Sequence, residues 1–176
     1  SRGGQRGAEG LEGLAQLAHG AVLDDLLKRA CDASADTSLP ATGVLRELGA
    51  RSASRVLDQL EVEMDSERRG RLTGVLLAMG EDVSPALAEA IVRGSKRRQR
   101  LALRLAGETQ NPRLVLNLRE AMLDGSDDVA REAAQALLRI GDVSALEALA
   151  EGLNSPRAAI AGFAAGPIRP SAARTC

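Results

Sequence analysis

The sequence predicts an all-α protein built as a right-handed solenoid of stacked helical hairpins. One reason is an internal repeat: ATGVLRELGAR begins at Ala41 and LTGVLLAMGED begins at Leu72, with Thr, Gly, Val, Leu and Gly recurring in the same order and spacing. A second reason is composition. The 176 residues are 44% hydrophobic, mostly Leu and Ala, and Phe163 is the single aromatic residue. Small and unbranched side chains favour helices over strands.

Helix boundary signals accompany this repeat. Glycine adopts positive φ without strain, so glycines that follow apolar runs are expected to end helices. These glycines recur at intervals close to that of the repeated phrase and are Gly49, Gly80, Gly107 and Gly141. Helices are expected to start where a polar cap precedes Pro. Such pairs are Ser84-Pro85, Asn111-Pro112 and Ser155-Pro156, and further starts are expected at Ser66, Ser95, Asp127 and Ser144.

The spacing fits a unit of one helix, a turn, a second helix and a linker. The predicted helix pairs are residues 20–33 with 38–48, 51–64 with 66–79, 83–94 with 95–106, 111–124 with 127–140, and 143–153 with 156–165. We expect residues 1–7 to be a flexible lead and residues 167–176 a loose tail. Residues 8–166 then form a single domain of about four to five repeats. An ordinary helical bundle is the alternative. Core positions in second helices are predicted at Leu76, Leu103 and Leu137.

One segment resembles a known repeat. Residues 127–153, DDVAREAAQALLRIGDVSALEALAEGL, are similar to the short HEAT-type repeat of phycobilisome-lyase-like (PBS-lyase type) proteins. The positions that carry the resemblance are Val129, Ala133, Ala134, Ala136, Leu137, Ile140, Gly141 and Asp142. The resemblance implies a HEAT-like stack whose second helices line the concave side. It implies little about function, because the pattern is a packing signature.

Catalytic and metal chemistry lack the residues they need. His19 is the only histidine, whereas metal-dependent hydroxylases built on HEAT repeats imply several His-Glu pairs. Residues 70–74 lack the lysine and glycine spacing of a phosphate loop. The acidic pair Asp127-Asp128 fits a helix N-terminus, where it stabilises the helix dipole by about 0.3–1 kcal/mol. We therefore predict a protein that is not an enzyme, with no catalytic residue, metal site or cofactor.

Cysteine usage and apolar runs bear on location. Cys31 and Cys176 match no metal or disulfide spacing, which is typical of a reduced, cytoplasmic chain. The longest uncharged run, residues 158–168, is shorter than the roughly 20 apolar residues that cross a bilayer. The start of the sequence shows no signal segment. A cytoplasmic monomer that does not engage membranes is the expectation.

The main functional feature is RGSKRRQR, residues 93–100, in which five of eight residues are basic. The predicted second helices carry a formal charge of +7, whereas the whole chain carries −1. A basic concave face is therefore predicted, and Arg97 and Arg98 are expected to be exposed on it. The alternative is a solvated helix face compensated by Glu89, Glu120 or Asp124. The predicted partner-binding residues are Lys96, Arg97, Arg98 and Arg104, assisted by Arg68, Arg69, Arg71 and Arg131.

Arg100 has conflicting signals in the sequence. Lys96, Arg100 and Arg104 share one helix face at i, i+4 and i+8. An alignment of the repeats on Gly107 and Gly141, however, matches Arg100 with an expected core position, Ala134. Arg100 is therefore left out of the predicted site.

These features favour two function classes. The first is a non-catalytic protein–protein interaction scaffold or adaptor that binds an acidic partner segment through the basic concave face. The second is a nucleic-acid module that contacts the phosphate backbone. The near-zero net charge and the absence of stacking aromatics disfavour this second class. A lyase-like or chaperone-like accessory protein, implied by the family resemblance alone, is the third and weakest alternative.

Overall fold

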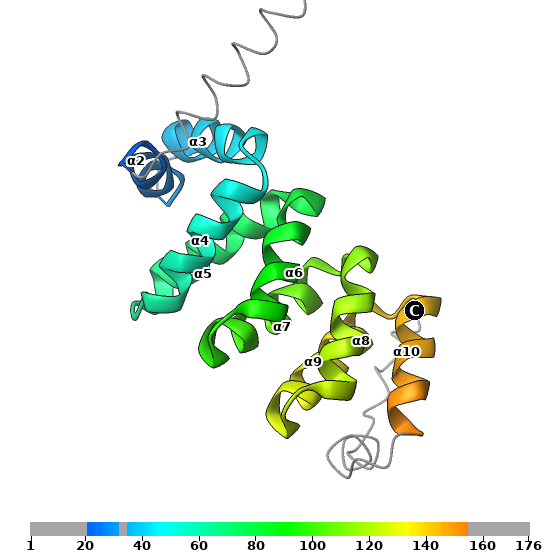
Figure 1. The fold of residues 1–176 in the computed structure, drawn as a ribbon. Coiled ribbons are helices and arrows are strands. Elements are labelled where there is room, and N and C mark those ends of the chain that lie inside the picture. The colour runs from blue at the N-terminus through cyan, green and yellow to red at the C-terminus, as the bar shows by residue number, and fades with distance from the viewer. Residues whose placement is uncertain (1–20, 32–34, 155–176) are drawn as a thin grey trace, which may run out of the picture.

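The chain forms an all-α helical solenoid (Figure 1). The computed structural model describes residues 21–31 and 35–154, in which there is no strand. The first helices of the hairpins are α2 (Ala21–Ala30), α4 (Ala50–Val62), α6 (Ser84–Arg93) and α8 (Val115–Asp124). Their second helices are α3 (Ala35–Glu47), α5 (Ser66–Ala78), α7 (Lys96–Thr109) and α9 (Asp127–Ile140). The helix α10 (Val143–Leu153) follows, and the short 3-10 helices η1 (Gly80–Val83) and η2 (Pro112–Leu114) precede α6 and α8.

Some predictions concern residues outside the described ranges. These are the lead at 1–7, His19, the start at Ser155-Pro156, the helix 156–165, Phe163, the tail at 167–176 and Cys176. The domain limits and the right-handed sense of the stack stay predictions. The helical hairpins themselves are confirmed by the order of the described elements.

Three of the four predicted stop glycines follow helix ends with positive φ. Gly49, Gly80 and Gly141 have φ of 58°, 62° and 66°. The prediction for Gly107 was wrong, since α7 continues to Thr109 and its C-cap is Gln110, in the left-handed region with φ 49°. With Gln110 in place of Gly107, successive left-handed caps are almost evenly spaced along the chain. The repeat is therefore more regular than the glycines alone indicate.

Gly107 instead serves helix packing. It is buried in α7, and a Cβ built on it would lie 3.0 Å from the Cα of Ala136 in α9. The missing side chain lets α7 and α9 approach closely, and the two helices are in contact along much of their length. By contrast, α5 and α7 touch at few points. The row of second helices is thus tightly packed on one side of α7 and open on the other.

The Asn111-Pro112 pair starts η2 with Asn111 as its cap, as predicted, whereas the Ser84-Pro85 pair starts α6 without a side-chain cap. Ser84 begins α6 without capping it, and its Oγ donates to the carbonyl of Glu81 at 2.7 Å. The side chain of Asn111 accepts a hydrogen bond from the backbone N–H of Arg113 and donates from Nδ2 to Ser84 Oγ at 2.6 Å. Ser84 and Asn111 are both buried. The two pairs therefore link successive hairpins through a buried hydrogen bond.

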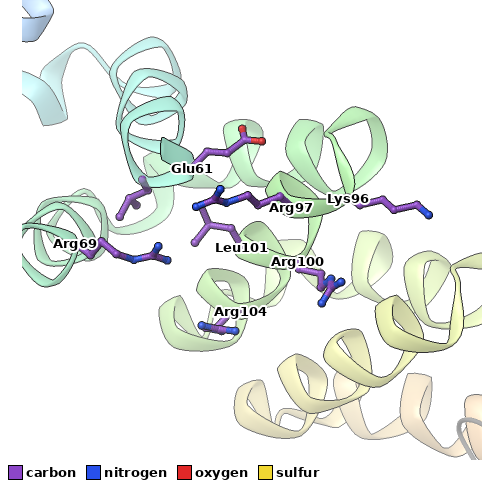
Figure 2. Close-up of a pocket in the computed structure, with 8 residues that line it drawn as sticks. Glu61, Arg69, Lys96, Arg97, Arg100, Leu101 and Arg104 are labelled. Carbon is purple, nitrogen blue, oxygen red and sulfur yellow. The ribbon is translucent and has the colours of Figure 1, made fainter. Parts of the chain in front are cut away.

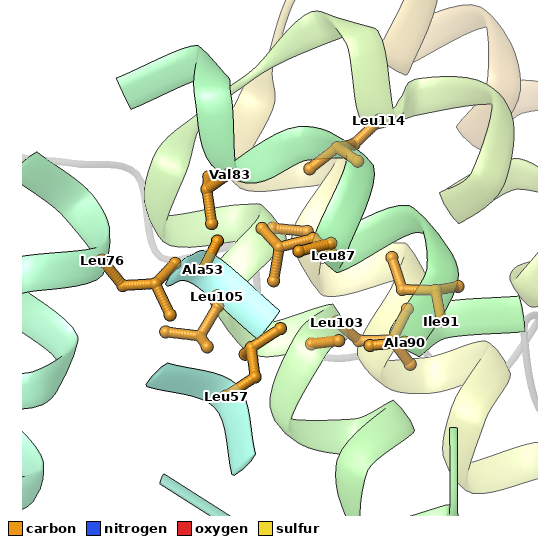
Figure 3. Close-up of a cluster of buried hydrophobic side chains, with 14 of the residues drawn as sticks. Ala53, Leu57, Leu76, Val83, Leu87, Ala90, Ile91, Leu103, Leu105 and Leu114 are labelled. Atoms are coloured by element: carbon orange, nitrogen blue, oxygen red, sulfur yellow. The ribbon is translucent and has the colours of Figure 1, made fainter. Parts of the chain in front are cut away.

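The core runs through the stack and consists mainly of leucine and alanine. Leu76, Leu103 and Leu137 each have 0% exposure, which confirms them as core residues. Figure 3 shows Leu57 of α4, Leu76 of α5 and Leu105 of α7 in one cluster of side chains. Each hairpin thus buries its apolar face against the next one, as a solenoid requires.

Candidate partner-binding site

A basic groove lies where α5 and α7 diverge. It encloses about 430 Å³ beside the C-terminal part of α4. Its apolar lining comes from Leu60 of α4 and Leu101 of α7, and its charged lining consists of Glu61, Arg69, Lys96, Arg97, Arg100 and Arg104. Five cationic side chains therefore share this groove with one carboxylate.

Three of these cations point into the space between α5 and α7. Figure 2 shows the guanidinium groups of Arg69, Arg97 and Arg104 between α5 and α7, whereas Lys96 and Arg100 extend away from α5. Arg69 is presented by α5, and the other two are presented by α7. We refer to Arg69, Arg97 and Arg104 as the arginine cluster.

The arginine cluster has no carboxylate partner among the described residues. Arg97 and Arg104 are exposed, and no ion pair is formed by either of them within residues 21–31 and 35–154. Arg69 donates from Nη1 to the backbone carbonyl of Glu63 at 3.2 Å, a bond that leaves its charge uncompensated. A cleft of one charge sign focuses an electric field that attracts counter-ions.

The single carboxylate of the groove is already engaged. Glu61 accepts a hydrogen bond from Ser95 Oγ at 2.6 Å, and its Oε2 lies 3.7 Å from Arg98 Nη1. Ser95 also caps α7, since its Oγ accepts from the backbone N–H of Arg98. These contacts tie the start of α7 to the end of α4, and they turn the Glu61 carboxylate toward α7's first residues.

Arg98 does not line the groove. Its guanidinium pairs with Asp58 and Glu61 of α4, and its side chain is 21% exposed. The expectation that Arg97 and Arg98 are both exposed is therefore corrected for Arg98. Its acidic partners lie on the preceding hairpin and differ from Glu89, Glu120 and Asp124, the compensating residues considered from sequence.

The remaining predicted residues also lie outside the groove lining. Arg68 Nε pairs with Glu63 Oε2 at 3.1 Å, and Arg71 Nη1 pairs with Glu67 Oε1 at 2.6 Å. Arg131 Nη1 lies 4.0 Å from Asp128 Oδ1. Of the eight predicted residues, the groove brings together Arg69, Lys96, Arg97 and Arg104.

Arg100 is the groove residue that the sequence-based set omits. It is exposed, it lines the groove, and its Nη2 lies 4.0 Å from Asp128 Oδ2 of α9. The signal for including it was present in the i, i+4, i+8 spacing with Lys96 and Arg104. The alignment on Gly107 obscured that signal, because Gly107 is not the equivalent of Gly141.

Two other arginines that reach between hairpins pair with carboxylates of the chain itself. Arg55 of α4 makes two hydrogen bonds of 2.8 Å to Asp24 of α2 and holds the pKa of Asp24 below its usual range. Arg119 of α8 likewise makes bonds of 2.5 and 2.6 Å to Glu151 of α10, and it lowers the pKa of Glu151. The arginine cluster differs from both of these pairs in having no such acid.

The placement of Arg97 and Arg98 predicts different effects of charge reversal. Arg98→Glu would put a third carboxylate beside Asp58 and Glu61, so we expect the free energy of unfolding to fall by about 1.5–3 kcal/mol. Arg97→Glu changes an exposed charge and should alter stability by less than about 0.5 kcal/mol. Urea unfolding followed by circular dichroism measures both. Equal effects of the two reversals would contradict the ion pairs between α7 and α4.

Metal sites and membrane-spanning helices are both absent from the described part of the chain. Among its residues, no group of three or more His, Cys, Asp and Glu side chains is arranged to hold a metal ion. None of the helices described there combines the length and apolar character needed to cross a membrane.

Residues 84–165 match the family model for HEAT repeats. The matched region includes α6 to α10, and the groove lies at its N-terminal border, where α5 adds Arg69. The comparison with curated proteins gives no match. HEAT repeats generally act as protein-interaction scaffolds and are generally non-catalytic. The match does not identify the phycobilisome-lyase-like subtype. Together with the stacked hairpins, it supports a HEAT-repeat protein.

Proposed function

We propose that this protein is a non-catalytic interaction scaffold or adaptor that binds an acidic segment of a partner protein in the groove between α5 and α7. The observation that carries the proposal is the arginine cluster without an internal carboxylate. Elsewhere, Arg55 and Arg119 reach between hairpins and each pairs with an acid on the neighbouring hairpin. At this groove a complementary charge would come from another molecule.

The groove chemistry suits a peptide segment with mixed character. Leu60 and Leu101 offer apolar surface beside the cations, so aliphatic side chains can pack there while carboxylates meet the arginines. Guanidinium groups bind carboxylates through two parallel hydrogen bonds, which adds geometric specificity to the charge attraction. Lys96 and Arg100 extend the positive surface toward the α9 side. Cytoplasmic location and a monomeric state belong to the same proposal.

A labelled Glu-rich peptide tests the proposal by fluorescence anisotropy. The double variant Arg97→Glu, Arg104→Glu should bind the peptide at least about tenfold more weakly, a loss of about 1.4 kcal/mol. Arg46→Glu is the matched control, because Arg46 is exposed on α3 and does not line the groove. Binding should also weaken with salt, since exposed charges are screened beyond about 8 Å at physiological ionic strength.

Competition separates the proposed partner from the nucleic-acid alternative. A duplex DNA of arbitrary sequence should displace the peptide poorly. Efficient displacement by the duplex would favour phosphate-backbone binding instead. Unchanged peptide affinity in the double variant would show that the groove is not the binding site.

A further inference from the structure

We infer that the arginine cluster recognises a phosphoryl group, carried by a phosphorylated serine or threonine in the partner's acidic segment. The inference rests on the proposed function and specifies the chemistry of its central contact. Three guanidinium groups from two helices face the same opening, and no carboxylate of the described chain neutralises them. Together the three arginines offer more positive charge than a single carboxylate neutralises.

The ion pairs of this protein show how carboxylates and arginines pair within the chain. Both carboxylate oxygens of Asp24 accept hydrogen bonds of 2.8 Å from Arg55 alone. Both carboxylate oxygens of Glu151 accept hydrogen bonds from Arg119 alone in the same way. Where one carboxylate meets two arginines, as Asp58 and Asp128 do, at least one of the two contacts is as long as 4.0 Å. A carboxylate that entered the groove would therefore be expected to pair closely with at most one arginine of the cluster.

A phosphoryl group matches the cluster better in charge and in acceptor number. Phosphoserine carries a charge of about −1.5 to −2 at neutral pH and has three strong acceptor oxygens. Arginine suits such a group because its planar fork donates two parallel hydrogen bonds. The site presents arginines alone at the opening, and its one lysine, Lys96, points away from it. The composition of the cluster thus favours a phosphate ester over a carboxylate.

The position of the cluster adds a second consequence. Arg69 belongs to α5, whereas Arg97 and Arg104 belong to α7, and these two helices touch at few points. A dianion held by arginines of both helices would join them across the groove. Binding should therefore slow amide hydrogen exchange in α5 and α7 more than in α8 and α9, which are already packed closely.

The test uses one acidic peptide in three forms, with serine, phosphoserine or glutamate at its centre. Anisotropy titrations with the full chain should give the phosphoserine form an affinity about tenfold above the serine form, equivalent to about 1.4 kcal/mol. The glutamate form should fall between the two. The advantage of phosphoserine should disappear in Arg69→Gln and in Arg97→Gln, and it should persist in the control Arg46→Gln. Circular dichroism of each variant establishes that it is folded.

The outcomes distinguish this inference from the proposed function. If the phosphoserine and glutamate forms bind equally and both need the cluster, the phosphoryl inference is overturned while acidic-segment binding stands. If none of the peptides binds, both fail. Inorganic phosphate should compete only at concentrations far above those of the phosphopeptide. Equal competition by inorganic phosphate would reduce the groove to a simple anion site and would overturn recognition of a modified segment.

Discussion

Replacing Leu103 by Ala is expected to lower the free energy of unfolding by about 2–5 kcal/mol. Leu103 lies in the middle of α7 with 0% exposure, and Figure 3 shows it beside Ala90 and Ile91 of α6. The truncation removes apolar contacts and leaves a cavity that close-packed neighbours fill only in part. Urea unfolding monitored by circular dichroism measures the change.

Leu138→Ala is the matched control for this truncation. The same Leu-to-Ala replacement can be made at Leu138 of α9, whose side chain is 56% exposed. Its replacement should change stability by no more than about 0.5 kcal/mol. A loss of that small size for Leu103→Ala would instead show that the buried face of α7 is misassigned.

The second large effect is expected at Gly125, in the turn between α8 and α9. A Cβ at this position would lie 2.3 Å from the carbonyl oxygen of Ala121 and 2.5 Å from Cγ1 of Val129. Those separations are too short for unbonded atoms, so Gly125→Ala must displace backbone at the turn. We expect a loss of about 1–3 kcal/mol in the free energy of unfolding, the usual range for overpacking.

Gly70→Ala gives the opposite expectation for the same chemical change. Gly70 lies inside α5, and a Cβ there would meet nothing within 4 Å. Alanine should therefore raise the free energy of unfolding by about 0.5–1 kcal/mol, because glycine in a helix interior is the more costly residue. The two variants can be compared in one denaturation series. Stabilisation by both would show that the α8–α9 turn is looser than its geometry indicates.

The hairpins could be predicted from sequence because their signals are local. Apolar spacing, capping residues and positive-φ glycines all act within a few residues of the helix they define. The prediction that Gly107 ends a helix was wrong because a glycine after an apolar run can either end a helix or allow a neighbouring helix to pack closely. Only the position of Ala136, in the second helix of the next hairpin, distinguishes these two roles. Gln110 was missed because a non-glycine residue in the left-handed region leaves no compositional signal.

Only part of the site could be predicted, because the direction in which each side chain points depends on its exact position around the helix. Adjacent residues on a helix point about 100° apart, so Arg97 and Arg98 cannot face the same way. Aligning the two hairpins on the Gln110 and Gly141 caps matches Arg98 with Val129, which is buried. This register explains why Arg98 turns toward α4. Its partner Asp58 lies 40 residues upstream in another helix, so the spacing of residues along one helix could not predict this ion pair.

The sparse contact between α5 and α7 also bears on cooperativity. In a stack where each hairpin is held only by its neighbours, the weakest junction limits how far one unfolding event spreads. The α2–α5 block and the α6–α10 block are joined mainly through α4, which packs on both α6 and α7, while α5 and α7 leave the arginine groove between them. A ligand seated in the groove would add a second link, between α5 and α7, so occupancy of a small surface would strengthen the coupling between the two blocks when the molecule is under stress.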